Sequence, residues 1–342
     1  MRAESDRNVS ISPLGLHSVL MLLWLGAAGE TRRDIGQALK LAEGCTDTAN
    51  RWRQRSTVLK SATSMWTQGA VGIVPAFYGQ IERYDNAVVK SLPRENAADA
   101  INRWVASATQ GKIVRIVNVL DPAVRLVFVN ALYFAARWLF PFDERLTQPG
   151  TFHLSNAKNP VLPFMTRVAD LSYRSDGRCE WIRLPYAGAP LAMDVLLPKP
   201  GVPLKDLCGT LLQFGEPGSA LPPPIAGRIR LPRFKVSMAD SMKPPLSALG
   251  LSRIFDLARA DFSAMVAATS SLAVGDVRQS VFIAVDEAGT EAAAATSASM
   301  VGSLPQPVLR FDMNVDRPFL IAIRDTNDGL VLFLSAVREP QA

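Results

Sequence analysis

The segment from Val285 to Leu304, which reads VDEAGTEAAAATSASMVGSL, is the most informative part of the chain. It follows the short apolar run 281–285, which is typical of a β-strand, and then passes through a glycine into small side chains. Four consecutive alanines would favour a helix on propensity alone. The strand that leads into them favours an extended segment instead.

In a β-sheet this segment would have two different faces, because successive side chains of a strand point to opposite sides. One face carries Thr290, Ala292, Ala294 and Thr296, and the other carries Glu291, Ala293, Ala295 and Ser297. The first face has no charge and no side chain larger than threonine, so it could enter between two existing strands without a steric or desolvation penalty. The alternative interpretation is a flexible linker rich in alanine and serine.

The segment closely resembles the reactive-loop hinge of the serpins, the serine protease inhibitor superfamily. Further blocks resemble serpin motifs in the same order along the chain, from Asn8 to Pro340. They are NVSISP at 8–13, NALYFAARW at 130–138, the spaced residues Phe140, Phe142, Thr147 and Phe152, DRPF at 316–319 and LVLFLS at 330–335. The resemblance implies the α+β serpin fold, with three β-sheets, a shell of about eight helices and an exposed reactive-centre loop at about 286–307. It also implies a single serpin domain over residues 1–342.

Length and composition agree with one large domain. The chain has 342 residues, 48% of them hydrophobic, and no linker rich in Gly, Ser or Pro divides it. The longest apolar run, 19–28, is too short to span a membrane. The net charge of +6 is modest and the basic residues are mostly scattered. We therefore expect a monomer that binds neither membranes nor nucleic acid.

Chemical motifs of enzymes and cofactor-binding proteins are missing from the sequence. It contains no phosphate-binding loop, dinucleotide fingerprint or hydrolase elbow, and its three cysteines form no C-x-x-C pair. His17 and His153 are the two histidines, and neither lies in a plausible catalytic turn. We predict no enzyme activity, no metal site and no cofactor.

The residues that precede the first serpin-like block pose an open question. The first helix of the family normally lies before this block, but here only residues 1–7 do, without the features of a signal peptide. Either the natural start lies upstream, with a secretion signal, or the first helix is missing. The expected location is the extracellular space or the periplasm, and the cytoplasm if Met1 is the natural start.

The resemblance implies specific roles for residues of the loop. The hinge comprises Glu287, Gly289, Thr290, Glu291, Ala292, Ala293, Ala294, Ala295 and Thr296. Counting fourteen residues on from Gly289, by the spacing of the family, puts the scissile bond between Ser303 and Leu304. Met300–Val301 is the rival bond. A small residue before the bond indicates a target serine protease of the elastase or subtilisin type.

The implied activity is suicide-substrate inhibition. A target protease would cleave the loop and become trapped as an acyl-enzyme while the cleaved loop enters the central sheet. Two alternatives remain open. The chain could be a non-inhibitory serpin that binds other molecules or assists folding, or an inhibitor of cysteine proteases that uses the same loop movement.

Four further residues correspond to positions that control opening of the sheet in serpins. Ser12, Asn130 and Gln279 match the shutter, the place where the central sheet parts, and Trp138 matches the breach, where the loop first enters. Gln279 stands in place of a family histidine, and Gly15 in place of a second serine. Without the resemblance, Asn130 is a buried amide that needs local partners, and Trp138 is an ordinary core aromatic.

Secondary structure outside the loop is predicted from local patterns. Pro13 at a first helical position and the apolar stripe up to Gly26 predict a helix, and an amphipathic pattern predicts another at 96–110. A third helix is predicted at 242–249, ending at Gly250. Apolar runs predict strands at 126–134, 191–197 and 229–234.

Overall fold

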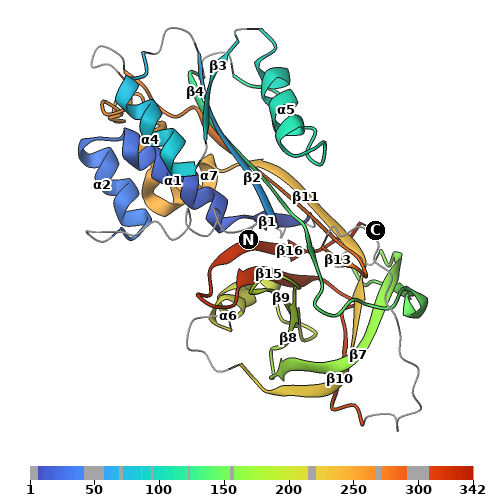
Figure 1. Ribbon diagram of the computed structural model, residues 1–342. Helices are drawn as coiled ribbons and strands as arrows, with labels where there is room; N and C mark the ends of the chain where they lie inside the picture. Colours follow the sequence, from blue (N-terminus) through green and yellow to red (C-terminus); the bar gives the residue numbers. More distant parts are fainter. Residues whose placement is uncertain are drawn as a thin grey trace. The chain divides into compact units, whose positions relative to one another are not determined.

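The computed structural model in Figure 1 describes most of the chain, and its residues cluster into two compact units. The described residues are 7–41, 58–68, 72–85, 87–93, 95–121, 124–154, 158–214, 221–266, 271–290 and 308–341. Unit 1 contains residues 1–12, 134–236 and 283–342, and unit 2 contains residues 13–133 and 237–282. Each unit is therefore assembled from stretches that are far apart in the sequence.

Unit 2 is built on a sheet that contains the buried strand β4 (Leu126–Phe134). The order of its strands is β3 (Val88–Leu92), β2 (Leu59–Gln68), β4 and β12 (Asp276–Val285). The β3–β2 and β4–β12 pairs are parallel, and β11 (Phe234–Ser241) pairs with β12. Every residue of β4 is buried, as its continuous apolar run predicts for a strand covered on both faces.

Helices cover the two faces of this sheet, and the alternation of β4 side chains shows which helix covers which face. Leu126 and Phe128 belong to the core cluster that contains residues of α1, α4 and α7. Val127 and Val129 belong to the other cluster, which contains residues of α5. In Figure 1, α5 lies across the strands from α1 and α4. The α-helices in the described part of unit 2 are α1 (Pro13–Gly26), α2 (Gly29–Ala38), α4 (Pro75–Asp85), α5 (Ala97–Ala108) and α7 (Lys243–Leu246).

The helix predictions agree with these elements, with one difference at the third helix. The predicted helix at 13–26 is α1, and the one at 96–110 is α5. At 242–249 the α-helix is only four residues long, and the chain continues in a wider π-type turn, η3 (Ser247–Leu251), and a 3-10 turn, η4 (Ser252–Phe255). Gly250 lies within η3 and has a φ of 91°, which a glycine adopts without the strain of a side chain.

Unit 1 contains two sheets that share the long strand β7 (Val161–Ser175). Its last residues, 173–175, pair with β8, whereas 164–172 pair with β10. The first sheet has the order β1 (Val9–Ile11), β16 (Val331–Val337), β15 (Phe319–Asp325), β9 (Leu191–Pro198), β8 (Cys179–Pro185) and β7. The second contains β6 (Gln148–Thr151), β7, β10 (Pro224–Pro232) and β14 (Phe311–Asn314).

Short helices complete unit 1. They are η1 (Glu144–Leu146), η2 (Leu204–Leu207) and α6 (Cys208–Gln213). Leu211 of α6 packs with Leu196 and Leu320 of the first sheet in one buried cluster. The strand predicted at 191–197 is β9, but the one predicted at 229–234 is divided at Arg233 between β10 and β11.

These elements confirm the α+β class and the three sheets. The described part of the chain contains six α-helices, against about eight expected for the whole chain. The short strands β5 (Ala136–Arg137) and β13 (Gly289–Thr290) lie at the base of the predicted loop and form the site described next.

Candidate functional site

The base of the predicted hinge is already part of a sheet. Strand β13 pairs antiparallel with the end of β12, where Thr290 lies opposite Val285. On its other side β13 pairs with β5, where Thr290 lies opposite Ala136 and Gly289 opposite Arg137. The chain therefore enters the sheet between β12 and β5 before it reaches the alanine run.

A tight turn connects β12 to β13, and Asp286 closes it. The Asp286 carboxylate accepts hydrogen bonds from the N–H groups of Ala288 and Gly289, at 2.9 and 3.1 Å. Its own N–H donates to the carbonyl of Gly289 at 2.9 Å. Aspartate often stabilises a turn in this way, by bonding to backbone two residues on.

Gly289 is required at its position by the neighbouring backbone. A Cβ atom there would lie 2.2 Å from the carbonyl oxygen of Ala136 and 2.7 Å from Cα of Arg137. Both are main-chain atoms of β5 and cannot rotate away. Only a glycine lets β13 pair this closely with β5.

Thr290 occupies a fully buried position among aromatic side chains. Its side-chain oxygen lies 2.6 Å from the hydroxyl oxygen of Tyr186. The Tyr186 ring stacks on Trp138, with centroids 4.5 Å apart and planes at 11°, and meets the edge of Phe134 at 5.0 Å. Burial raises the pKa of the Tyr186 hydroxyl above its ordinary value, so this hydroxyl stays protonated and available for hydrogen bonding.

Trp138, the predicted breach residue, holds the turn that precedes β13. Its indole N–H donates to the carbonyl of Asp286 at 3.0 Å, and its backbone N–H donates to the carbonyl of Ala288 at 3.0 Å. The side chain is 2% exposed. The structure thus brings Trp138 into direct contact with the hinge, beyond packing in the core.

Glu287, the first hinge residue, is 3% exposed and anchored by two side chains. Arg233 donates from Nε to both of its carboxylate oxygens, at 2.9 and 2.8 Å, and the Thr147 hydroxyl donates to one of them. Burial alone would raise the pKa of Glu287, but the hydrogen bonds from Arg233 and Thr147 outweigh it and hold the pKa below its ordinary value.

This anchor predicts a pH-dependent stability. A carboxylate whose pKa is lowered by folding contributes stability above its unfolded pKa, about 4.3, and loses it as pH falls through the lower folded value. We expect Glu287→Gln to lower the free energy of unfolding by about 2 kcal/mol at pH 7, and by less below pH 4. Urea denaturation at both pH values measures this difference.

Glu30→Gln is the matched control, because Glu30 pairs with Arg253 on the surface and its side chain is 61% exposed. We expect it to change the unfolding free energy by less than about 1 kcal/mol. An equal effect of both substitutions would contradict the anchoring role of Glu287.

Two predicted shutter residues meet in unit 2. Gln279 and Asn130 lie opposite each other in the β12–β4 pair, and both are buried. Gln279 donates to the side-chain oxygen of Asn130 at 3.1 Å, and Asn130 donates to the Thr63 hydroxyl at 3.0 Å. The buried amide of Asn130 therefore has side-chain partners on two neighbouring strands, as burial of a polar group requires.

Gly15 explains how the amide pair fits beneath α1. A Cβ atom at this position would lie 2.1 Å from Oδ1 of Asn130 and 2.7 Å from a methyl carbon of Leu132. A serine there would need a different arrangement of Asn130. The glycine thus makes room for the Asn130–Gln279 pair.

The third shutter residue, Ser12, lies in unit 1. Its hydroxyl is buried and donates to the carbonyl of Leu332 at 2.6 Å. The expected network between Ser12 and Asn130 joins residues of different units and stays a prediction. The remaining hinge residues, Glu291 to Thr296, lie outside the described residues, as do Ser303, Leu304, Met300 and Val301.

Sequence reasoning missed Tyr186 and Arg233 as site residues. Tyr186 lies 104 positions from Thr290 in the sequence, and Arg233 lies 54 from Glu287, so no local spacing links them. Thr147 stood at serpin spacing but carried no assigned role. The available signal at Arg233 was a charged residue within the predicted strand 229–234, and Arg230 gives the same signal there.

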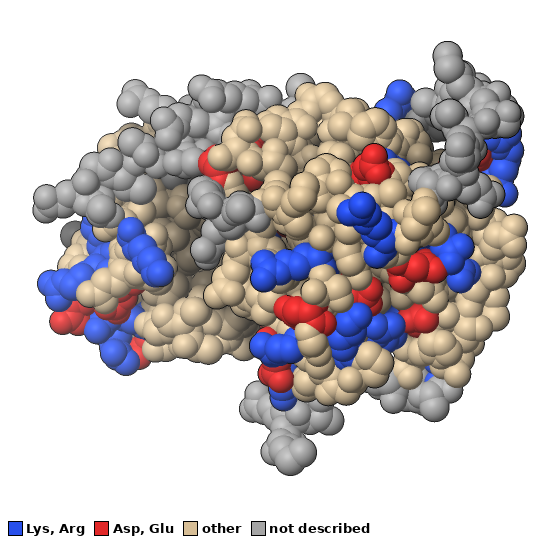
Figure 2. Space-filling model, turned by 90° about the horizontal axis from the view of Figure 1, so that it is seen from below, with Lys and Arg blue, Asp and Glu red and all other residues tan. Residues whose placement is uncertain are grey.

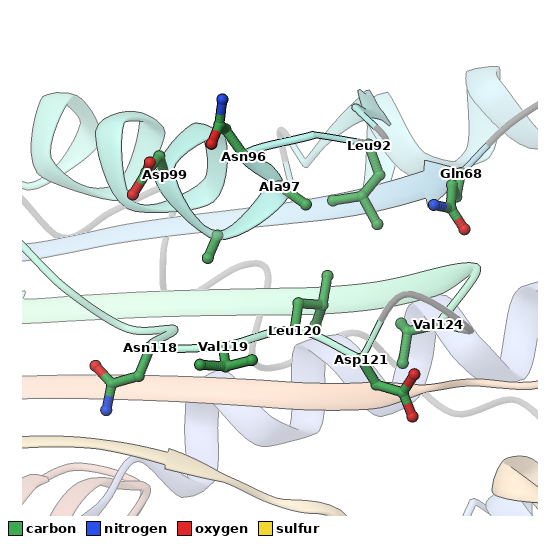
Figure 3. Close-up of a pocket in the computed structure, with 11 residues that line it drawn as sticks. Gln68, Leu92, Asn96, Ala97, Asp99, Asn118, Val119, Leu120, Asp121 and Val124 are labelled. Atoms are coloured by element: carbon green, nitrogen blue, oxygen red, sulfur yellow. The ribbon is translucent and has the colours of Figure 1, made fainter.

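One face of the molecule and one cavity can be described outside the site built above. On the face in Figure 2, basic side chains are interspersed with acidic ones. In unit 2, a cavity of about 310 Å³ lies beside the N-terminus of α5. Leu92 and Leu120 point toward it, whereas the amides of Asn96 and Asn118 point away (Figure 3). Gln68, Asp99 and Asp121 also line the cavity, so its wall combines apolar and polar side chains.

The described residues lack a metal-binding cluster and a membrane-spanning helix. They contain no group of three or more His, Cys, Asp or Glu side chains that could hold a metal ion. Within the same residues, every helix is too short or too polar to cross a membrane.

Comparison with known proteins identifies the family. A family model described as "Serpin (serine protease inhibitor)" matches residues 1–340. A serine protease inhibitor of Cyanea capillata is 30% identical over 361 residues, which cover 99% of this chain and 94% of the relative. Plasminogen activator inhibitor 1 of Bos taurus is 30% identical over 364 residues, which cover 99% of this chain and 89% of the relative.

Solved structures agree with this result. The crystal structure of Serpin48, a highly specific serpin of the insect Tenebrio molitor, matches with a TM-score of 0.86 at 25% identity. The match covers 99% of this chain and 93% of that structure. With a family model that spans nearly the whole sequence and relatives at 30% identity, the chain belongs to the serpin family.

Proposed function

We propose that this serpin inhibits serine-type endopeptidases as a suicide substrate. The observation that carries the proposal is the position of Thr290, an uncharged side chain fully buried in a sheet at the base of the loop. The residues that would follow on the same face of an inserted strand, Ala292, Ala294 and Thr296, are also small and uncharged. Further insertion would therefore bury no charge and need no large space.

The chemical step belongs to the protease, and the loop supplies the substrate. The serine hydroxyl of the protease attacks the carbonyl carbon of Ser303, and its proton passes through the catalytic base to the departing amine of Leu304. The peptide bond breaks and an ester joins the protease to the new C-terminus. Water would normally hydrolyse this ester, so trapping requires that insertion of the loop be faster.

Insertion would extend β13 along β12. The new strand would then replace the present β12–β4 pairing, in which Gln279 lies opposite Asn130. The hydrogen bond between these two amides would break, and both side chains would need new partners. The shutter pair is thus one barrier that the energy of strand addition must overcome.

The experiment that tests this function uses elastase-like, subtilisin-like, trypsin-like and papain-like proteases with denaturing gel electrophoresis. We expect a band near the summed mass that survives boiling, with an elastase- or subtilisin-like enzyme. A stable band with the papain-like enzyme alone would replace the proposal by cysteine-protease inhibition. Cleavage of the loop without any such band would replace it by the non-inhibitory alternative.

The cleaved bond gives a second expected result. Mass spectrometry of the released C-terminal peptide should show Leu304 as its first residue, because the Ser303–Leu304 bond lies at serpin spacing from Gly289. A peptide that begins at Val301 would instead assign the rival bond Met300–Val301. The inserted strand would then be three residues shorter, about 10 Å of travel along the sheet.

We further propose that residues 1–342 act as one domain and as a monomer. The interleaved stretches of the two compact units support a single domain, since separate domains are usually joined by one linker. Each inhibitor molecule would be consumed by its protease, without enzyme activity, a cofactor, nucleic acid or a membrane. The proposed location is the extracellular space or the periplasm, where such proteases act on secreted substrates.

A further inference from the structure

The hydroxyl groups of Thr290 and Tyr186 form an isolated polar pair inside an apolar site. The two oxygens are 2.6 Å apart, Thr290 is fully buried and Tyr186 is 3% exposed. A buried hydroxyl that loses its partner is unfavourable, because water no longer reaches it. The pair therefore favours the conformation in which Thr290 lies inside the sheet.

Contacts that do not involve Thr290 hold the Tyr186 ring in one orientation. Trp138 stacks on one face and Phe134 meets the ring at 68°. The backbone N–H of Tyr186 donates to the carbonyl of Leu191 at 2.9 Å. Because the ring is fixed, its hydroxyl can bond a partner at only one position. The Tyr186 side chain therefore loses little rotational freedom when the hydrogen bond forms.

The pair also distinguishes one strand register from the next. Side chains alternate between the faces of a strand, so a slip by one residue moves the other face into the same place. A shift of the chain by one residue would put Glu291 where Thr290 now lies. Its carboxylate would then be buried beside aromatic side chains, which is unfavourable for an unpaired charge. A slip would also remove Gly289 from the point where β5 leaves no room for a side chain.

We propose that Tyr186 is a positioning residue: it seats Thr290 in the sheet of the uncleaved protein and so sets the register in which the loop inserts. The proposal rests on the proposed inhibitory function only for its kinetic consequence. The seating itself is a property of the native protein. Insertion after cleavage then extends an existing strand and needs no search for the first pair.

Hydrogen exchange tests the seating without any protease. The N–H groups of Trp138 and Asp286 donate to the carbonyls of Ala288 and Gly289, so exchange at both groups reports opening of the turn that holds β13 in the sheet. Tyr186→Phe and Thr290→Val should each speed exchange at these two groups roughly tenfold, whereas Thr290→Ser, which keeps the hydroxyl, should restore slow exchange.

Tyr173→Phe is the matched control, because it also removes a hydroxyl bonded within unit 1. The Tyr173 hydroxyl donates to Glu180 at 2.7 Å, and its ring stacks on Phe311. We expect no change of exchange at Trp138 or Asp286. Equal exchange in wild type, Tyr186→Phe and Thr290→Val, or equal behaviour of Thr290→Ser and Thr290→Val, would overturn the proposal.

A kinetic readout separates positioning from general stability. With a protease that the wild type traps, Tyr186→Phe should raise the amount of cleaved inhibitor per trapped protease several-fold, while the rate of first cleavage stays constant. A ratio equal to that of the wild type would overturn the positioning role. If no protease is trapped by the wild type, the proposed function fails, and the exchange result still decides whether Tyr186 seats Thr290.

Discussion

Thr290→Arg should convert the protein from an inhibitor into a substrate. The arginine would have to enter the buried position beside Tyr186, where desolvation of an unpaired charge opposes burial by several kcal/mol. Insertion would slow by a factor of about 100 or more, and hydrolysis of the acyl-enzyme would win. Titration of a fixed amount of protease should show a large rise in the inhibitor needed for each protease molecule inactivated.

The control for this prediction is the same substitution at an exposed threonine. Thr151 lies in β6 of unit 1 and is exposed, so Thr151→Arg adds the same charge without burying it. We expect it to inhibit like the wild type. Full inhibition by Thr290→Arg would contradict the proposed insertion of the loop from its present position.

Asp194→Ala should produce the largest loss of stability. Asp194 is fully buried in β9 and binds Arg183 through two hydrogen bonds, at 2.6 and 2.8 Å. The Nε atom of Arg324, a side chain 1% exposed, lies 2.8 Å from the same carboxylate. Removal of the acid would leave two buried guanidinium groups side by side, so we expect a loss of about 3–5 kcal/mol in urea denaturation.

Two further variants show whether lost charge pairing or lost packing causes the loss of stability in Asp194→Ala. Asp312→Asn removes an acid that pairs with Arg228 at the surface, where both side chains are more than 40% exposed, and should cost less than about 1 kcal/mol. Replacement of Asp194, Arg183 and Arg324 together by leucine and methionine should recover most of the lost stability. A loss below about 1 kcal/mol in Asp194→Ala would contradict the proposed role of the buried cluster.

Local sequence patterns were sufficient to predict elements in which propensity and burial favour the same conformation. The strand at 126–134 is apolar on both sides, and the structure buries all of its residues. The helix at 13–26 begins at a proline and carries an apolar stripe, and it was predicted with the observed ends. In both elements local propensity and burial favour the same conformation, so no distant partner is needed to explain them.

The strand predicted at 229–234 shows where local patterns fail. Its apolar residues favour one continuous strand, yet the chain changes partners at Arg233, between β10 and β11. Arg233 turns to Glu287, which lies 54 positions away. The energy of this ion pair depends on how distant segments pack, and periodicity within six residues carries no information about it.

The size, charge and backbone propensity of the residues at the loop base can be read from the chain alone. It showed a glycine, a threonine and a run of alanines on a strand that could enter a sheet, and the serpin motifs assigned that strand to a hinge. Only the folded protein shows that Gly289 and Thr290 already lie in the sheet. It also shows that Thr290 contacts Tyr186 and that Glu287 contacts Arg233. The physical reason is that strand register and side-chain contacts between distant segments arise from packing of the whole core, whereas size, charge and propensity belong to each residue.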